Sequence, residues 1–226
     1  MEIGTGWGGL ALHAARTYGC RVTTTTISAE QRKWATEKIK EAGLADRVTV
    51  LGEDYRKLEG TFDKLVSVEM IEAVGHHYLD LFFRCCGRLL KPHGLMALQA
   101  ITVPNRLFLQ HRTRATFINT YIFPGSCLPS DAAMLNSIAR KTDLELVHKE
   151  DISSHYARTL ALWRDNFYSQ IDHIRKVWPD RSFSRMWELY FSCCEAGFAE
   201  RDIGVGQYLL AKPKARPRIG HLNFQG

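Results

Sequence analysis

The chain has 226 residues, of which 45% are hydrophobic and 24% charged, and its net charge is +6. This composition is that of an ordinary globular protein and excludes a disordered, collagen-like or highly charged chain. No apolar run approaches the ~20 residues that span a bilayer, and no secretory signal opens the sequence, so a cytoplasmic protein is expected.

Predicted helices and strands alternate through the first half of the chain. The predicted helices cover residues 10–16, 29–42 and 77–90, and the predicted strands cover residues 21–27, 47–51, 62–68 and 94–102. Gly19 ends the first helix, and Ser28 is an N-cap that Gln31 completes as a capping box. This alternation predicts an α/β fold with a central, mostly parallel sheet and helices on both faces.

The second half is predicted to complete the same domain and to add a helical insertion. The expected elements are helices over 131–142, 156–177 and 182–194 and strands over 144–151 and 205–212. The insertion comprises two segments, at about 104–142 and 156–195. Residues 1–213 are expected to form one domain, and residues 214–226 a flexible tail.

The cysteines and histidines predict neither disulfides nor a metal site. Four of the six cysteines form two vicinal pairs, and the nine histidines lack the spacing of metal ligands. Buried, reduced thiols are therefore expected. The net charge of +6 is compatible with an anionic lipid surface, but an ordinary basic surface explains it equally well.

A glycine-rich loop near the start of the chain is the first functional motif. Residues 2–9 read Glu-Ile-Gly-Thr-Gly-Trp-Gly-Gly, and a predicted helix follows, so backbone N–H groups point at any bound ligand. The spacing differs from the G-x-G-x-x-G of dinucleotide-binding proteins and from a P-loop. Glu2 stands where S-adenosylmethionine (SAM) enzymes hold the amino group of their cofactor. The loop alone is equally compatible with a purely structural turn.

Further cofactor contacts are expected at the ends of the next two strands, where α/β sheets bind ligands. The second strand carries threonines and no acidic residue, so Thr26 and Gln31 are candidates for hydrogen bonds to ribose hydroxyls. Asp54 follows the third strand and is a candidate acceptor for the adenine amino group. The structural alternatives are a simple β-strand for the threonines, the capping box for Gln31 and a turn for Asp54.

Motifs that extend along nearly the whole chain carry a family resemblance. They lie at residues 2–9, 24–31, 54–56, 67–75, 98–101, 123–129, 155–160 and 194–198. Together they resemble the cyclopropane-fatty-acid synthase family, which includes the mycolic acid cyclopropane synthases. The set is specific to this family, although the glycine loop alone is not. The resemblance implies a Rossmann-like fold of the class I SAM-dependent methyltransferases.

The resemblance also implies a reaction. SAM delivers a methyl group to the cis double bond of an unsaturated phospholipid acyl chain, and a carbocation forms. Bound bicarbonate then removes a proton, and the cyclopropane ring closes. Such a site must exclude water and present negative charge where positive charge develops. A protein peripheral to the membrane is implied, a homodimer is possible, and no nucleic-acid partner is expected.

The family's functional residues can be carried over onto matching positions of this chain. The implied cofactor-binding set is Glu2, Gly4, Thr5, Gly6, Gly8, Thr26, Gln31, Glu53 and Asp54. Glu72 matches a glutamate that orients bicarbonate, Tyr156 a tyrosine that hydrogen-bonds it, and Ile101 a residue whose backbone contacts it. Gln99 stands where many members have histidine, and it can hydrogen-bond an anion but cannot titrate. Without the resemblance, Glu69 is an equal candidate to Glu72 by position.

Several alternatives stay open. The family carries a segment before the glycine loop, with a cysteine that contacts bicarbonate, and this chain is expected to lack it. An inactive SAM-binding fragment or homologue is therefore one alternative. Another is a SAM-dependent methyltransferase that acts on a different small molecule or makes a methyl-branched lipid.

Aromatic residues of the second half have two interpretations. They either line an acyl channel or simply pack helices onto the sheet, and simple packing is favoured for most of them. The residues concerned are Trp163, Phe167, Tyr168, Trp178, Trp187, Tyr190 and Phe191.

Overall fold

The computed structural model describes residues 1–216, and within them seven strands form one sheet with the order β3-β2-β1-β4-β5-β7-β6. The strands are β1 (Glu2–Ile3), β2 (Val22–Thr25), β3 (Val48–Leu51), β4 (Phe62–Val68), β5 (Leu90–Thr102), β6 (Glu145–Asp151) and β7 (Gly204–Ala211). In this sheet β7 runs antiparallel to β5 and β6, and the other neighbouring pairs are parallel. The mostly parallel sheet confirms the predicted α/β class.

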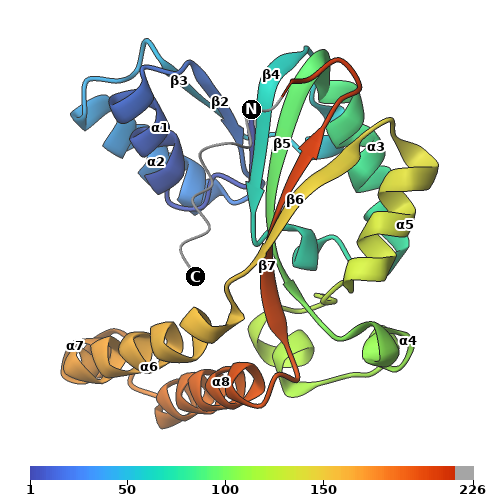
Figure 1. The fold of residues 1–226 in the computed structure, drawn as a ribbon. Helices are drawn as coiled ribbons and strands as arrows, with labels where there is room; N and C mark the ends of the chain where they lie inside the picture. Colours follow the sequence, from blue (N-terminus) through green and yellow to red (C-terminus); the bar gives the residue numbers. More distant parts are fainter. Residues whose placement is uncertain (217–226) are drawn as a thin grey trace.

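Helices cover both faces of the sheet, as expected (Figure 1). They are α1 (Gly9–Tyr18), α2 (Ala29–Glu41), α3 (Leu79–Leu89), α4 (Phe108–His111), α5 (Asp131–Lys141), α6 (Ser153–Ser169), α7 (Ile171–Val177) and α8 (Arg181–Ala199). α1 and α2 lie on one side, α3 and α5 lie on the other, and α4 gathers with α6–α8 at one end of the sheet (Figure 1). Within the described residues, no helix has the length and apolar character needed to cross a membrane.

The helical insertion differs in extent from the prediction. α5 lies inside the predicted segment 104–142 but belongs to the sheet body, because Met134 and Ile138 are buried in the main core. The helix predicted over 156–177 is two helices, α6 and α7, which meet at Gln170. α8 continues beyond its predicted end because Phe198, in its last turn, is buried against β7 and α6.

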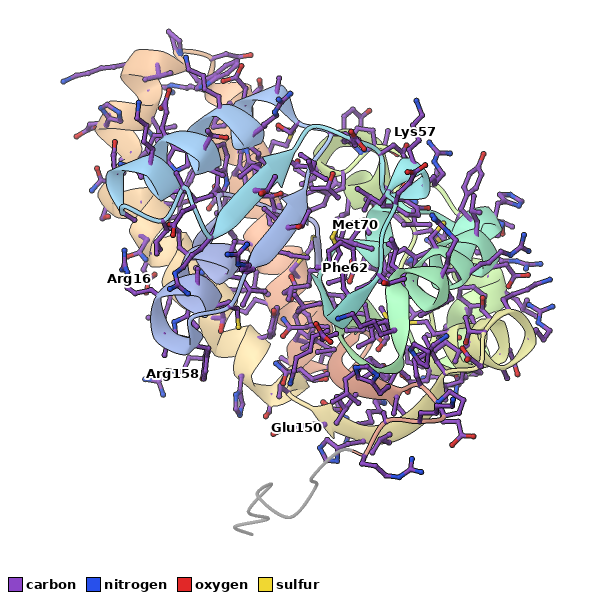
Figure 2. All side chains as sticks on the ribbon, turned by 90° about the horizontal axis from the view of Figure 1, so that it is seen from above. Arg16, Lys57, Phe62, Met70, Glu150 and Arg158 are labelled. Carbon is purple, nitrogen blue, oxygen red and sulfur yellow. The ribbon has the colours of Figure 1, made fainter. Side chains whose placement is uncertain are left out.

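A small apolar cluster of Ala11, Ala15, Ile39 and Val48 packs α1 and α2 against β3. Two larger apolar clusters join the other layers. The larger lies between the sheet and the helices α3 and α5, and it includes Leu65 of β4, Phe82 of α3 and Met96 of β5. The second joins α6 and α8 to β7 and includes Leu160 and Val205. Side chains fill the space on both sides of the sheet (Figure 2). Removal of this apolar surface from water is the main force that holds the helices on the sheet.

The cysteines are free thiols, as expected, but only some of them are buried. Cys85, Cys86 and Cys194 are buried, whereas Cys20 and Cys193 are exposed. Successive residues of a helix point in different directions, so Cys194 faces the apolar cluster that joins α8 to α6 and β7, while Cys193 faces solvent. The interpretation of all six as buried thiols is therefore wrong for part of the set.

Part of the predicted flexible tail is packed. The Lys214 N–H donates to the Pro92 carbonyl oxygen at 3.1 Å, and Ala215 is buried. Residues 214–216 thus lie against β5. The remainder of that predicted tail, residues 217–226, lies outside the described residues.

The strand order reverses beside β1, which lies between β2 and β4. Glu2 pairs with Thr24 of β2 and with Val66 of β4, and the Ser67 hydroxyl of β4 donates to the Ile3 carbonyl oxygen at 2.9 Å. Loops that leave the carboxyl ends of β1 and β4 therefore diverge to opposite faces of the sheet. Such a switch point opens a crevice, which is where open α/β sheets bind ligands.

We predict that Leu65→Ala lowers the free energy of unfolding by about 2–5 kcal/mol, the usual cost of emptying a buried leucine site. Leu65 is 1% exposed and belongs to the central strand β4. Urea unfolding followed by circular dichroism measures the change. Leu109→Ala is the matched control, because Leu109 is 67% exposed. Equal losses in the two variants would contradict this account of the core.

Candidate active site

The glycine loop leaves β1 with backbone conformations that require glycine. Gly4, Gly6 and Gly8 have φ angles of 103°, 52° and 88°. A Cβ on Gly8 would also lie 3.0 Å from the Cβ of Ala35 on α2, which is too close for an undisturbed contact. Because α1 begins at Gly9, the loop carries the chain into a helix N-terminus whose free N–H groups favour a polar or anionic ligand.

Glu2, which precedes this loop, has a buried and only partly paired carboxylate. It is 4% exposed, and its Oε2 has no hydrogen-bond partner within the described residues. Burial raises the pKa of Glu2 to about 7, against the opposing effect of a hydrogen bond from Thr24. An unpaired buried oxygen costs free energy until a donor reaches it. The ammonium or hydroxyl groups of SAM would supply that donor, so the predicted cofactor fits this end of the crevice.

Threonine hydroxyls organise the end of β2. The Thr26 hydroxyl donates to Gln31 Oε1 at 2.9 Å and accepts from the Ser28 N–H at 3.1 Å. The Ser28 hydroxyl accepts from the Gln31 N–H at 3.2 Å, which confirms the predicted N-cap. The capping box is only half right, because the Gln31 side chain bonds to Thr26 instead of the Ser28 N–H. Within residues 1–216 the Gln31 amide N–H groups have no partner, so they stay candidate donors to a cofactor.

Other predicted cofactor residues are engaged with neighbours. The Thr5 and Thr24 hydroxyls hydrogen-bond each other at 2.8 Å. Arg56 donates to both carboxylate oxygens of Asp54, at 2.9 and 2.5 Å, and this hydrogen bonding lowers the pKa of Asp54. Glu53 is exposed. Asp54 thus has the contacts expected of a turn residue, and cofactor binding by Asp54 and Glu53 stays a prediction.

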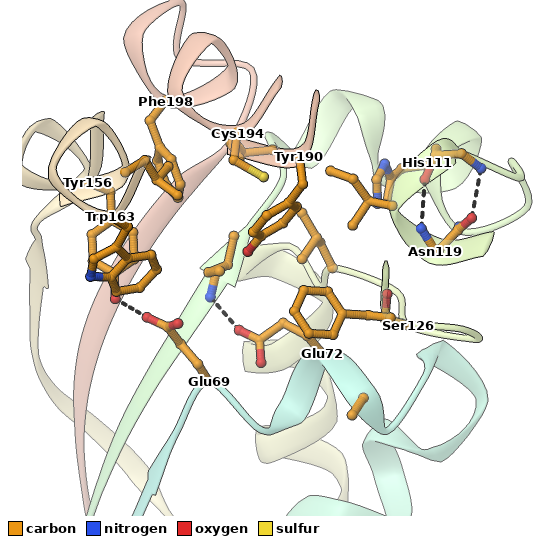
Figure 3. Close-up of a pocket in the computed structure, with 18 residues that line it drawn as sticks. Glu69, Glu72, His111, Asn119, Ser126, Tyr156, Trp163, Tyr190, Cys194 and Phe198 are labelled. Atoms are coloured by element: carbon orange, nitrogen blue, oxygen red, sulfur yellow. Dashed lines mark hydrogen bonds between the residues drawn. The ribbon is translucent and has the colours of Figure 1, made fainter. Parts of the chain in front are cut away.

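A cavity of about 290 Å³ lies beside the carboxyl ends of β4 and β5, under the helical insertion. Its lining is mostly apolar and includes Leu160 and Trp163 of α6 and Tyr190 of α8. Glu69 and Glu72 reach it from the loop after β4 (Figure 3). A mainly apolar pocket with a few convergent polar groups is the usual form of a small-molecule site.

Glu72 is the more deeply buried of these two carboxylates. It is 8% exposed, and the Ile101 N–H donates to its Oε1 at 2.5 Å. Its Oε2 is buried without a partner in the described part of the chain. Burial raises the pKa of Glu72 to about 7. The structure therefore brings Glu72 and Ile101 together as predicted, but the Ile101 N–H is bonded to Glu72 itself.

Tyr156 and Gln99 meet at Glu69. The Tyr156 hydroxyl donates to Glu69 Oε1, and Gln99 Nε2 donates to the same Oε1 at 2.7 Å and to the Tyr156 oxygen at 2.8 Å. Gln207 of β7 donates to Gln99 Oε1 at 2.8 Å, which fixes the orientation of the Gln99 amide. Burial and the hydrogen bond to Glu69 raise the pKa of Tyr156, so its hydroxyl keeps its proton. Glu69, which only its position had suggested, joins the predicted set.

The aromatic residues divide between the cavity and the helix packing. Trp163 and Tyr190 line the cavity. Trp187 and Phe191 contact each other with ring centroids 5.8 Å apart, as their shared helix face predicts, and they pack α8 against its neighbours. Tyr168 is an exposed residue of α6. Simple packing thus describes Phe167, Trp187 and Phe191, fewer residues than expected, because Tyr168 and Trp178 are exposed and two others line the cavity.

Comparisons with known proteins agree with the resemblance. The family model described as mycolic acid cyclopropane synthetase matches residues 1–208. Tuberculostearic acid methyltransferase UfaA1 of Mycobacterium tuberculosis is 41% identical over 94% of this chain and 49% of its own length. The cyclopropane-fatty-acyl-phospholipid synthase of Escherichia coli K12 is 36% identical over 94% of this chain and 53% of its own length. The chain therefore spans about half the length of these relatives.

A solved structure shows the same fold. The cyclopropane synthase MmaA2 from Mycobacterium tuberculosis aligns with a TM-score of 0.85 over 93% of this chain and 76% of that chain, at 26% sequence identity. The predicted Rossmann-like fold of class I SAM-dependent methyltransferases is thereby confirmed. The glycine loop, the Glu2 carboxylate and the cavity therefore lie on a scaffold that this group of enzymes shares.

We predict that Glu2→Gln flattens the pH dependence of stability. The pKa of Glu2 rises from 4.5 to about 7 on folding. The folded state then binds more protons than the unfolded state between these values, so stability falls as the pH rises through this window. The fall that Glu2 causes is at most about 3 kcal/mol. Urea unfolding at pH 4.5 and pH 7.5 measures the fall, which is expected to be smaller in the variant.

Glu145→Gln is the matched control for this measurement. Glu145 is exposed on β6, so its variant is expected to keep the pH dependence of the unmodified protein. If the free energy of unfolding falls equally with pH in Glu2→Gln and in the unmodified protein, then folding does not raise the pKa of Glu2.

Proposed function

The chain belongs to the mycolic acid cyclopropane synthetase family, whose members are SAM-dependent methyltransferases, and on this premise we propose that it adds the methyl group of SAM to the cis double bond of an unsaturated acyl chain and closes a cyclopropane ring. One observation carries the proposal. The carboxyl ends of the neighbouring strands β1 and β4 carry two different environments: a polar end, which is Glu2 with the glycine loop, and an apolar end, which is the cavity with two carboxylates. These two ends suit a charged, polar cofactor and a hydrocarbon substrate.

The polar end is assigned to the cofactor. SAM supplies an electrophilic methyl group when it is bound. We propose that Glu2 accepts a hydrogen bond from the amino group of SAM through its unpaired Oε2, while Gly4, Gly6 and Gly8 let the ligand approach the backbone. Gln31 is proposed as the donor to a ribose hydroxyl. Burial strengthens this contact, because a donor that reaches Glu2 also removes the free-energy cost of a buried, unpaired oxygen.

The apolar end is assigned to the acyl chain. The aromatic and aliphatic lining of the cavity excludes water, which would otherwise capture a carbocation. The negative charge at the cavity end beside β4 stabilises the positive charge that develops on the alkene. The family resemblance predicts bicarbonate, held by Glu72, Tyr156, Gln99 and Ile101, as the acceptor of the proton. Whether a bound anion or a carboxylate of the chain takes this role is a separate question from the methyl transfer itself.

A phospholipid of a membrane surface is the proposed source of the acyl chain. Leu109, Tyr121 and Phe123 are at least half exposed on the insertion, and Phe123 also lines the cavity. Arg112 and Arg114 are exposed on the same segment. Exposed apolar side chains beside arginines suit an anionic lipid surface, from which an acyl chain could enter the cavity.

Methyl transfer without ring closure is the second candidate function. The observation in its favour is the 41% identity to a relative that is named a tuberculostearic acid methyltransferase, a name that specifies methyl transfer. Both candidates share the cofactor, the alkene and the carbocation. They differ in what the electrons of the broken C–H bond form, a ring bond in one case and a new double bond in the other, which nuclear magnetic resonance of the product identifies.

We predict that the full-length protein transfers label from methyl-labelled SAM to vesicles of unsaturated phospholipid and leaves saturated vesicles unlabelled. The alkene is the nucleophile in the proposed reaction, so a saturated chain has nothing to react. Thin-layer chromatography of the extracted lipid measures the transfer. Label that appears equally in saturated lipid would contradict an attack by the double bond.

We predict that Glu72→Gln and Tyr156→Phe lower turnover by ~10-fold or more, the effect of losing a group that acts on a proton or a charge in the transition state. The affinity for S-adenosylhomocysteine, measured by calorimetry, is expected to stay nearly unchanged, because both residues lie at the apolar end. Tyr18→Phe is the control, since Tyr18 is 72% exposed on α1. A loss of cofactor affinity equal to the loss of turnover would contradict the assignment.

A further inference from the structure

The hydrogen-bond donors predicted to hold an anion are all engaged within the protein. The Ile101 N–H donates to Glu72, and the Tyr156 hydroxyl donates to Glu69. The Gln99 amide nitrogen donates to Glu69 and to the Tyr156 oxygen. An anion that entered this cluster would have to displace one of these bonds. The donors therefore already serve the carboxylates of the chain.

Glu69 receives the bonds that a free carboxylate-like anion would need. Its Oε1 accepts from both Tyr156 and Gln99, whereas its Oε2 accepts no hydrogen bond in the described part of the chain. Glu69 lines the cavity, and Gln99 stands behind it without reaching the cavity wall. Figure 3 shows the Glu69 carboxylate extending toward Tyr156 at the cavity end beside β4. Bicarbonate and a glutamate side chain present the same pair of carboxylate oxygens to such donors.

The backbone of Glu69 is held in a conformation that side chains rarely adopt. Its φ is 49°, a left-handed value that among the described non-glycine residues recurs only at Arg201. The Glu69 N–H donates to the Gln99 carbonyl oxygen at 2.9 Å, so β5 fixes this conformation. Left-handed non-glycine residues cost free energy and cluster at functional sites. A glycine would meet the backbone requirement at no cost, so the glutamate side chain itself needs a reason.

We propose that the Glu69 carboxylate is the base of the reaction, built into the chain at the place predicted for bicarbonate. This inference rests on the proposed addition of a methyl group to an alkene. The alkene electron pair forms the bond to the methyl carbon, the bond from that carbon to the cofactor sulfur breaks, and the neighbouring alkene carbon becomes cationic. Glu69 Oε2 then takes a proton from the transferred methyl carbon, and the electrons of that C–H bond close the ring. The Glu69 carboxyl later releases the proton to water.

The neighbouring groups suit this assignment. Loss of a proton from the methyl carbon quenches the carbocation two bonds away as the ring closes, so a carboxylate is basic enough to accept it. Tyr156 and Gln99 hold the carboxylate by Oε1 and leave Oε2 toward the cavity. Glu72, the other carboxylate of the cavity, is buried with an unpaired oxygen and bonds to Ile101 at a separate position. A tethered base also avoids the entropic cost of collecting a third reactant.

The first test is the bicarbonate dependence of the full-length protein. In buffer freed of carbon dioxide, its turnover on unsaturated phospholipid vesicles is expected to equal that in millimolar bicarbonate. A turnover that collapses without bicarbonate and returns when bicarbonate is added overturns the proposal, while the proposed function itself then stands. Absence of label transfer in both buffers contradicts the proposed function instead.

Two variants separate the charge of Glu69 from its shape. Glu69→Gly relieves the left-handed backbone and empties the carboxylate position, whereas Glu69→Gln keeps the shape without the charge. Both are expected to lose ~100-fold or more in turnover, the usual contribution of a general base. Bicarbonate or formate is expected to restore activity to Glu69→Gly but not to Glu69→Gln, whose amide fills the position. Glu145→Gln, on the exposed face of β6, is the matched control.

Folding and cofactor binding are checked separately, by thermal unfolding and by calorimetry with S-adenosylhomocysteine. A folded, cofactor-binding Glu69→Gly protein that stays active without added anion overturns the proposal. The same protein without rescue by either anion also overturns it, because the loss would not trace to a missing base.

A final measurement does not depend on turnover. Line broadening of ¹³C-labelled bicarbonate reports binding, and it is expected with Glu69→Gly and absent with the unmodified protein. Equal broadening by the two proteins would show that bicarbonate has its own site beside Glu69, and the proposal would fail.

Discussion

The pairing of β1 between β2 and β4 is the contact on which the whole site depends. β1 has only two residues, yet Glu2 pairs with both neighbours and Ile3 is buried in the main core. This position sets the glycine loop on one side of the switch point and the Glu69 loop on the other. The proposed reaction needs both loops, because the donor of the methyl group and the alkene have to meet between them.

The charges at this meeting point suit the cation of the proposed reaction. Two buried carboxylates, Glu2 and Glu72, have pKa values raised to about 7 by burial, and each has an unpaired oxygen in the described residues. Such groups destabilise a resting fold, since their charged forms are poorly solvated. A ligand that brings the missing donor or a positive charge offsets this loss of stability. These two carboxylates therefore lower the stability of the unliganded protein, and bound ligands are expected to raise it.

The parallel half of the fold could be predicted closely because its signals are local. Ser28 caps α2, Gly19 ends α1, and β4 has the bounds that its apolar pattern predicts. The break between α6 and α7 at Gln170 has no glycine or proline to mark it, and both helices pack against α8, which comes later in the chain.

The candidate site shows the same division between local and distant signals. Glu2 and the glycines could be found from the motif, and Glu72 and Tyr156 from the resemblance. The contact between Tyr156 and Glu69 joins residues far apart in the chain, and the left-handed backbone of Glu69 leaves no mark in the sequence. For that reason Glu69 could be named as a candidate by position but not given partners.

The antiparallel strand β7 affects the order in which the two ends of the proposed site are completed. In the register of the sheet, Gln207 of β7 lies opposite Gln99 of β5, and its side chain sets the amide that faces Glu69. β7 follows β5 and β6 in the chain but lies between them in the sheet. During synthesis the residues of the glycine loop and of its neighbours β2 and β4 are therefore all present long before Gln207 can reach Gln99. The proposed cofactor site therefore precedes the proposed reaction centre along the chain, and the last strand of the sheet completes the second of the two.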